Sequence, residues 1–290
     1  MLEPAVDGGP LGTPDAADAA AAVLTVDGQG PSRHGRALLA TFARRAVVPL
    51  ILIGLWQVAA SAGWINTTLT SSPVEVASAF YELLTDGKLI TNLLISLRRM
   101  GVGLLIGLPL GFAFGVIAGL SRLGEELVDS TMQALRVVHF VSLVPLFMLW
   151  FGIGEDSKVA LVAFGVAFPI YLNTYSGIRS VDAKLIEAAR VFGVGRTGLL
   201  RQVIVPGALP SILVGVRYAL GIAVIALVVA ETVDANSGIG ALVANARQFL
   251  QTDIVFVGIV VYSALGLIGD FIVRVLERRL LTWRGTFEGS

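Results

Sequence analysis

Few side chains in this sequence are of the types that carry out covalent chemistry. The 290 residues include no Cys and only two His, His34 and His139. Without Cys there is no thiolate nucleophile, disulfide or thiolate metal site, and two His cannot form a histidine-rich metal cluster. An enzyme would need a nucleophile–base pair or metal ligands, and these residues offer little for either. We therefore expect no catalytic residue, no metal ion and no cofactor in this chain.

One segment has the outline of a nucleotide site. Residues 193–198, Gly-Val-Gly-Arg-Thr-Gly, fit the pattern G-x-G-x-x-G. A dinucleotide site needs a strand before this pattern and a helix after it, inside a parallel sheet. A helical pattern precedes it here, and the sequence has no G-x-x-x-x-G-K-[ST] phosphate loop. We therefore expect no nucleotide on this chain. The formal net charge of zero also gives no basic surface for nucleic acid.

The composition indicates that most of the chain lies in lipid. Hydrophobic residues make up 55% of it and charged residues 14%, against about 25% charged in a typical soluble domain. Mean hydropathy is +0.81. So few charges could not cover a water-soluble fold with this much apolar surface. Because backbone polar groups in hydrocarbon must be bonded within their own segment, we expect an all-α integral membrane protein.

Long intervals with few charges predict six membrane-spanning helices, each near the roughly 20 residues needed to cross a bilayer. A tail of residues 1–45 precedes them. Its first 32 residues are rich in Ala, Gly, Pro and Asp, which is typical of disorder, and its end is basic. The membrane domain is predicted to cover 46–284, followed by a C-terminal tail at 285–290. The predicted spans lie near 46–63, 100–120, 137–153, 159–177, 209–230 and 254–276.

The Arg and Lys residues predict the orientation of these spans. With the N-terminus inside, the cytoplasmic side receives 16 of the 21 Arg and Lys, and the outside keeps 5. Both termini are then cytoplasmic. Arg98 and Arg99 are the discordant pair, and we expect them to extend toward water from the outer end of the second span. On the same side, residues 72–75, Ser-Pro-Val-Glu, predict a capping box that starts a short outer helix.

Small residues in the second span predict close helix packing. Glycine recurs at every fourth position, so another helix can approach its backbone closely. These residues are Gly103, Gly107, Gly111, Gly115 and Gly119.

The connection after the fourth span carries a short amphipathic pattern. Asp182 can cap a helix there, and Gly193 can end it. Few Lys flank its apolar face, which makes it a poor lipid anchor. From the pattern alone, docking against a protein partner is at least as well supported as a place on lipid headgroups. The apolar face consists of Leu185, Ile186, Ala189 and Phe192.

The same connection resembles a known family. Residues 187–189 read Glu-Ala-Ala, Gly193 follows, and residues 203–206 read Val-Ile-Val-Pro. This spacing matches the EAA signature of bacterial ABC-importer permeases: E-A-A, three residues, G, nine residues and I-x-L-P. One departure is the segment 136–140, Arg-Val-Val-His-Phe, where the family usually has prolines. The likeness extends from about residue 46 to 284 and includes segments similar to permeases for aliphatic sulfonates, taurine, nitrate and thiamine precursors, at 144–154, 168–174 and 230–253.

The resemblance implies a six-helix type I ABC importer transmembrane domain with a cytoplasmic coupling helix. It implies a homodimer in the bacterial inner membrane, with two ATPase subunits that hold ATP and Mg and an extracytoplasmic substrate-binding protein. The implied activity is ATP-driven import of a small organic anion by alternating access. Aliphatic sulfonates are the first choice of substrate, and taurine, nitrate or a thiamine precursor are the alternatives. The implied coupling residues are Glu187, Ala188, Ala189, Gly193, Val203 and Pro206.

Ionisable residues at membrane depth are further candidates, because they are costly there. Asp270 and Arg274 lie four residues apart and are expected to pair with each other. Arg217 could bind a sulfonate oxygen or pair with a neighbouring helix, and we favour the pairing. The candidates for the translocation pathway are Arg217, Asn173 and His139, although a packed histidine is the commoner role for the last. The receptor-side candidates, which flank the outer loop, are Glu231 and Arg247.

A stand-alone secondary transporter or channel is the rival interpretation. Proteins driven by an ion gradient usually carry intramembrane acids, and Asp270 is the only deep one in this sequence. Uptake that is unaffected by removing ATP would favour this rival.

Overall fold

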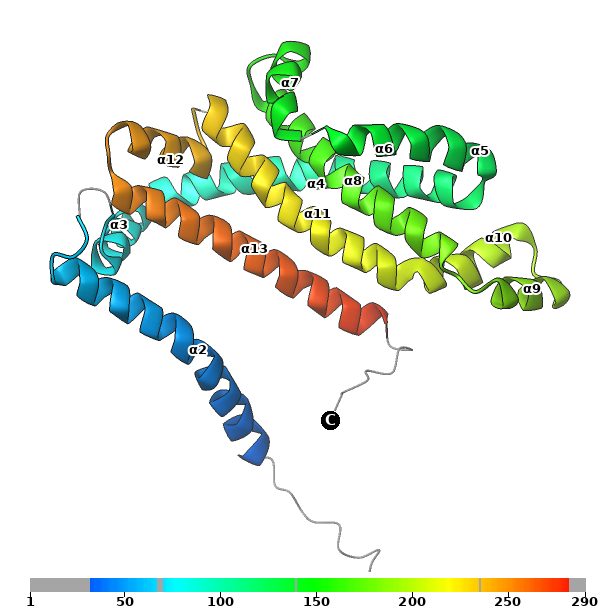
Figure 1. Ribbon diagram of the computed structural model, residues 1–290, viewed down its shortest axis with the longest axis horizontal. Helices are drawn as coiled ribbons and strands as arrows, with labels where there is room; N and C mark the ends of the chain where they lie inside the picture. Colours follow the sequence, from blue (N-terminus) through cyan, green and yellow to red (C-terminus); the bar gives the residue numbers. More distant parts are fainter. Residues whose placement is uncertain (1–31, 67–69, 139, 235, 282–290) are drawn as a thin grey trace, which may run out of the picture. The chain divides into compact units, whose positions relative to one another are not determined.

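The computed structural model describes residues 32–66, 70–138, 140–234 and 236–281, and the regular structure in these ranges is helical (Figure 1). The chain divides into two units, residues 1–55 and 56–290. Most of α2 (Ser32–Ser61) belongs to the first unit. The long helices of the second unit are α4 (Lys88–Leu120), α8 (Glu155–Arg179), α11 (Val205–Asp234) and α13 (Thr252–Leu280). Its shorter helices are α3 (Pro73–Thr85), α5 (Arg122–Gly124), α6 (Ser130–Val137), α7 (Val144–Phe151), α9 (Ala183–Val191), α10 (Arg196–Leu199) and α12 (Ile239–Gln248).

Within the described residues, four helical stretches are long and apolar enough to cross a membrane. They are Lys88–Leu120, Glu155–Arg179, Arg196–Val233 and Thr252–Leu280. These stretches contain the spans predicted near 100–120, 159–177, 209–230 and 254–276. The other two predicted spans, 46–63 and 137–153, contain the shorter apolar helices Val47–Ser61 and Val141–Phe151.

The segment predicted as one span at 137–153 is divided into short pieces. α6 ends at Val137, Val138 is extended (φ −78°, ψ 115°), and a 3-10 turn at Phe140–Leu143 leads into α7. At about 1.5 Å per residue, the 8 residues of α7 rise about 12 Å, less than half of a hydrocarbon core of about 30 Å. The segment of the predicted span 137–153 is therefore not one continuous helix. The chain breaks where the family usually has prolines, through the extended backbone of Val138.

The glycines of α4 let this helix pack closely against the backbone of α8, as their spacing predicted. The two helices cross each other in Figure 1. A Cβ added at Gly107 would lie 2.4 Å from the Ala163 carbonyl oxygen, and one added at Gly111 would lie 2.2 Å from that of Ala167. No other residue type fits such a contact without moving the helices. α8 also packs on α11, in a core that contains Val166, Ile170, Ala219, Ala223 and Leu227.

The predicted outer helix is α3, and its capping box is present. The Ser72 hydroxyl accepts a hydrogen bond from the Glu75 amide at 3.3 Å, and the Glu75 carboxylate accepts one from the Ser72 amide at 2.7 Å. This reciprocal pair fixes the start of the helix. α3 then packs with α4, α12 and α13 around Leu83, Ile239 and Val257.

The C-terminal half of α8 forms hydrogen bonds with a π-helical turn at Glu125–Asp129. The Tyr171 hydroxyl donates to Asp129 at 2.7 Å, and the Tyr175 hydroxyl donates to Glu125 at 2.8 Å. Arg179 forms an ion pair with the same Glu125. The three α8 side chains recur at every fourth position, so one face of the helix holds the turn and links it to the segment that follows Arg179.

Candidate functional site

The predicted amphipathic helix is α9, and its ends are those that the sequence predicted. The Asp182 carboxylate accepts a hydrogen bond from the Lys184 amide at 2.9 Å. Gly193 has φ +79°, and its amide donates to the Arg190 carbonyl at 3.0 Å. The next amide, of Val194, donates to the Ala189 carbonyl, also at 3.0 Å. These two bonds form a Schellman motif, which satisfies the last carbonyls of the helix and reverses the chain.

One part of the apolar face attaches α9 to the membrane helices. Ile186 and Ala189 pack against a core of Ile178 at the end of α8, Leu199 in α10, Ile204 and Ala208. Val203 joins the same core from the π-helical turn Leu200–Ile204. Pro206 lies in the first turn of α11 and is half-buried. Val203, a signature residue that follows Gly193, therefore packs in the same core as the inward-facing side chains of α9.

The other part of that face is turned to solvent, so the predicted face is divided. Leu185 and Phe192 of that face are 59% and 86% exposed, and Val191, which was not part of the predicted face, is also 86% exposed. Glu187 and Ala188 are exposed beside them, and the Glu187 carboxylate has no ion pair among the described residues. An exposed aromatic and two exposed aliphatic side chains on a capped helix are typical of a protein-docking surface.

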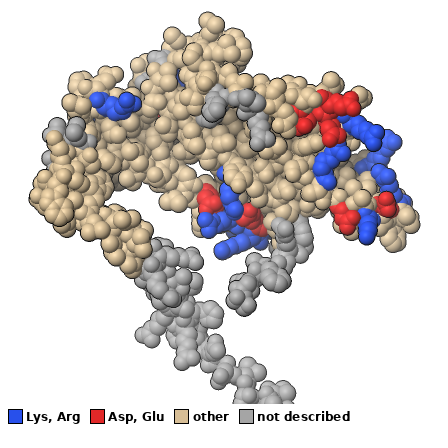
Figure 2. Space-filling view, viewed as in Figure 1, with Lys and Arg blue, Asp and Glu red and all other residues tan. Residues whose placement is uncertain are grey.

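Charged side chains gather around this helix. Figure 2 shows blue and red groups over α5, α9 and α10 and near the C-terminal end of α13, with a largely uncharged surface between these regions and a blue group at the opposite end of the view. The basic residues of the first region are Arg122, Arg179, Lys184, Arg190, Arg196 and Arg201. This separation fits helix ends in water and helix centres in lipid.

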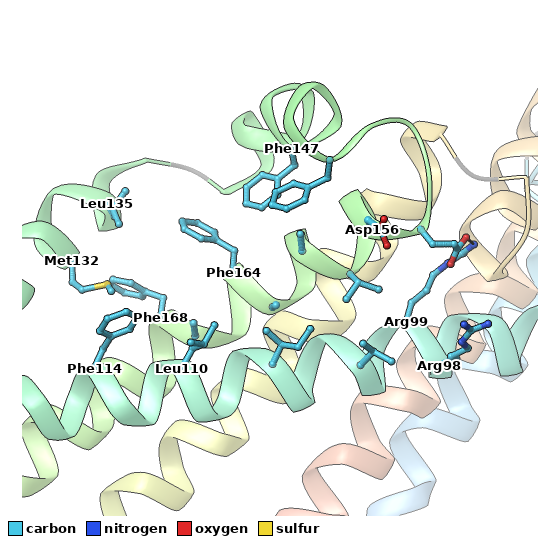
Figure 3. Close-up of a pocket in the computed structure, with 18 residues that line it drawn as sticks. Arg98, Arg99, Leu110, Phe114, Met132, Leu135, Phe147, Asp156, Phe164 and Phe168 are labelled. Atoms are coloured by element: carbon cyan, nitrogen blue, oxygen red, sulfur yellow. Dashed lines mark hydrogen bonds and ion pairs between the residues drawn. The ribbon is translucent and has the colours of Figure 1, made fainter.

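A cavity of about 770 Å³ lies between α4, α6, α7 and α8. Figure 3 shows aromatic side chains, including Phe114, Phe164 and Phe168, toward one end and the ionisable residues Arg98, Arg99 and Asp156 toward the other. No sequence pattern pointed to this cavity, because its walls come from four separate helices and meet only in the fold.

Arg99 forms a buried ion-pair network at the polar end. Its Nη1 lies 2.7 Å from Glu231 Oε1, and the side chains of the two residues are 2% and 0% exposed. Its Nη2 also donates to Glu155 at 2.5 Å and to the Ser237 hydroxyl at 3.0 Å. Glu231 further accepts hydrogen bonds from Ser96, from the Gly240 amide and from Tyr262. The network joins α4, α8, α11, α12 and α13.

This network corrects two expectations. Arg99 does not extend to water, because its guanidinium is neutralised inside the fold by Glu231. Glu231 has no exposed surface through which to meet a receptor. Arg98 is exposed, and Arg247 is exposed on α12, where a receptor could reach it. Opposite charges on two apolar spans, Arg99 and Glu231, were the sequence signal that could have predicted the pair.

The remaining pathway candidates do not meet at one site. Arg217 pairs across to α13, with Glu277 at 2.6 Å and Asp270 at 3.2 Å, and Arg274 pairs with the same Asp270, as predicted. The Asn173 amide donates to the Pro169 carbonyl of its own helix at 2.8 Å. Neither Arg217 nor Asn173 lines the cavity. His139 lies outside the described residues.

Comparisons with known proteins give a family and relatives that are transport permeases. Residues 107–282 match the family model described as the binding-protein-dependent transport system inner membrane component. One relative, from Bacillus subtilis (strain 168), is named as an aliphatic sulfonates transport permease protein. It is 44% identical over 243 residues, which are 84% of this chain and 88% of the relative. An Escherichia coli (strain K12) relative of the same name is 49% identical over 240 residues, 83% of this chain and 91% of the relative.

One solved structure shares the fold. A chain in the crystal structure of an amino acid ABC transporter with histidines superposes with a TM-score of 0.58 at 17% identity, covering 69% of this chain and 97% of that one. At this identity the likeness concerns the arrangement of helices alone.

Proposed function

Since this chain belongs to the family of binding-protein-dependent transport system inner membrane components, and is therefore an ABC-importer permease, we propose that it carries aliphatic sulfonates through the membrane in an ATP-driven cycle. The identity to two permeases named for aliphatic sulfonates, over more than four-fifths of the chain, supports this substrate class. The chain itself performs no covalent step. ATP and Mg bind to a separate ATPase subunit.

The observation that carries the proposal is α9. Leu185, Val191 and Phe192 offer the ATPase an apolar surface, and beside them lies the Glu187 carboxylate, which has no ion pair within the part of the chain that the structure describes. The inward-facing part of α9 is fixed to the membrane helices through Ile186 and Ala189. A subunit that binds the first set of side chains therefore moves the second set with it.

The motion passes to the spans through packed contacts. α9 sits against the end of α8 and the start of α11, and α8 is packed closely against both α4 and α11. When the ATPases close, α9 moves with them, and these three helices shift together between inward-facing and outward-facing arrangements. The two arrangements must differ in their contacts, because only a difference in free energy between them can couple ATP to transport.

The assembly in this proposal is a homodimer of the permease with two ATPases and an external binding protein. On the outer side, Phe249 and Leu250 directly follow α12 and are 71% and 69% exposed, close in sequence to the exposed Arg247. This surface suits a receptor that delivers its anion. We place α9 in the cytoplasm and the chain in a bacterial inner membrane, because the basic residues gather at the α9 end of the spans.

A charge reversal on α9 tests the proposal. In the permease–ATPase complex reconstituted in vesicles with its binding protein, Glu187→Lys is expected to lower ATP-dependent ethanesulfonate uptake at least about tenfold, equivalent to about 1.4 kcal/mol. Glu82→Lys makes the same change at an exposed position of α3 and should leave uptake within about twofold. Equal uptake and equal ATPase co-purification in wild type and Glu187→Lys would refute the coupling role of α9.

A further inference from the structure

One row of α4 side chains that lines the cavity begins with Arg98 and continues with apolar residues. Arg98, Val102, Ile106, Leu110 and Phe114 recur at every fourth position and all line it. Residues at this spacing lie on one side of a helix, and 16 residues of α-helix rise about 24 Å. The four apolar side chains are each between 38% and 48% exposed, so the described chain does not cover them. The glycine stripe, one position further along, packs on α8 and leaves this face open.

The opposite walls repeat the pattern. α8 contributes Glu155 and Asp156 at its first turn and then apolar residues up to Phe164 and Phe168, and α7 adds Phe147 (Figure 3). Both walls therefore place charge at the same end. The cavity is amphiphilic along its length, with a polar mouth and an aromatic and aliphatic body.

The ion pairs decide which charges at the mouth are available to a ligand. Arg99 is already bonded to Glu155 and to Glu231. Two lining side chains remain without an ion pair among the described residues, Arg98 and Asp156, and both are exposed. Asp156 stands in the first turn of α8, where the free amide groups of the helix stabilise a carboxylate. Arg98 interacts with the Glu155 carboxylate only at longer range and forms no ion pair among the described residues, so its N–H donors remain free for an anion.

We propose that this cavity is a transit site for aliphatic sulfonates, in which Arg98 pairs with the sulfonate and the alkyl chain lies against the apolar body. The inference rests on the proposed function and adds to it a place and an orientation for the substrate. A guanidinium matches the oxygens of an anionic head group through paired N–H donors. The volume of about 770 Å³ lies within the range of ordinary small-molecule sites. The permease then contributes its own selectivity for chain length.

Filling the apolar body tests the chain-length claim. Ala167 lines the cavity about three turns of α8 beyond Asp156, and Ala167→Phe places a ring where the distal part of a long chain would lie. In vesicles that hold the complete transporter, this variant is expected to lower octanesulfonate uptake about tenfold while ethanesulfonate uptake stays within about twofold. Ala113→Phe, at an exposed position of α4 that does not line the cavity, should change neither. An equal effect of Ala167→Phe on both substrates, or on neither, would overturn the proposal.

Changing the charges at the mouth gives an independent test. Arg98→Gln should raise the KM for both sulfonates about tenfold or more, because it removes a charge-assisted bond to the head group. Asp156→Asn, which removes the competing carboxylate, should lower the KM or leave it unchanged. An unchanged KM in Arg98→Gln, or a rise as large in Asp156→Asn, would overturn the site. ATP-dependent uptake of neither sulfonate by the wild-type complex would refute the proposed function itself.

Discussion

The buried Arg99–Glu231 pair predicts how far the free energy of unfolding falls when Arg99 is replaced. Arg99→Met keeps most of the side-chain length but leaves the Glu231 carboxylate fully buried without its cation. Ser96, the Gly240 amide and Tyr262 would still donate to it, so its hydrogen bonds are only partly lost. Leaving one buried charge unpaired typically costs about 3–5 kcal/mol. The other partner, Glu155, is 59% exposed and adds little, because water replaces the lost contact.

The assay is denaturant or thermal unfolding of the purified permease, with a double-mutant cycle. Glu231→Gln in the Arg99→Met background removes the orphaned charge and is expected to recover about 2 kcal/mol. Lys88→Met is the matched control on the same helix, because its partner Asp86 is 46% exposed and the pair should contribute at most about 1 kcal/mol. If Arg99→Met destabilised the protein no more than Lys88→Met, or if the double variant were as unstable as the sum of its parts, the reasoning would fail.

Two backbone predictions follow from glycine. Gly111→Ala drives a Cβ to 2.2 Å from the Ala167 carbonyl oxygen, so the helices must separate by about 1 Å at a cost of about 1–3 kcal/mol in unfolding free energy, while Gly101→Ala on the same helix meets nothing within 4 Å and should be near neutral. Gly193→Ala forces a Cβ into the left-handed region and should cost about 1–2 kcal/mol, seen as faster amide hydrogen exchange in α9; Gly195→Ala, whose φ is −67°, should leave that exchange unchanged. Equal effects of Gly111→Ala and Gly101→Ala on stability would contradict the close packing at Gly111. Equal effects of Gly193→Ala and Gly195→Ala on hydrogen exchange would contradict the role of the left-handed Gly193.

The local features of this fold were accessible from the sequence because their causes are local. Asp182 and Gly193 define α9 through caps that act within a few residues. The α3 capping box depends on Ser72 and Glu75, which are three positions apart. The glycine spacing of α4 also predicted close packing, although it could not name α8 as the partner.

The features that the sequence did not predict depend on contacts between distant segments. Arg99 and Glu231 are 132 residues apart, so their pairing is decided by how α4 and α11 are placed. The cavity likewise depends on four helices. The break at Val138 was missed for a different reason, since charge-free length indicates where lipid lies but does not show whether the helix is continuous. The apolar face of α9 was identified correctly as a set, but only the fold shows that Ile186 faces inward and Phe192 outward.

The most direct measurement of the central claim is the environment of residue 192 in the assembled transporter. The chain contains no Cys, so Phe192→Cys provides a unique thiol for a cross-linker or an impermeant maleimide. Phe192 is 86% exposed in the isolated chain, and we predict that the thiol cross-links to the ATPase and is protected from maleimide in the complex. Labelling of intact cells from the outside, or equal labelling with and without the ATPase, would contradict the assignment of α9 as the helix that an ATPase moves.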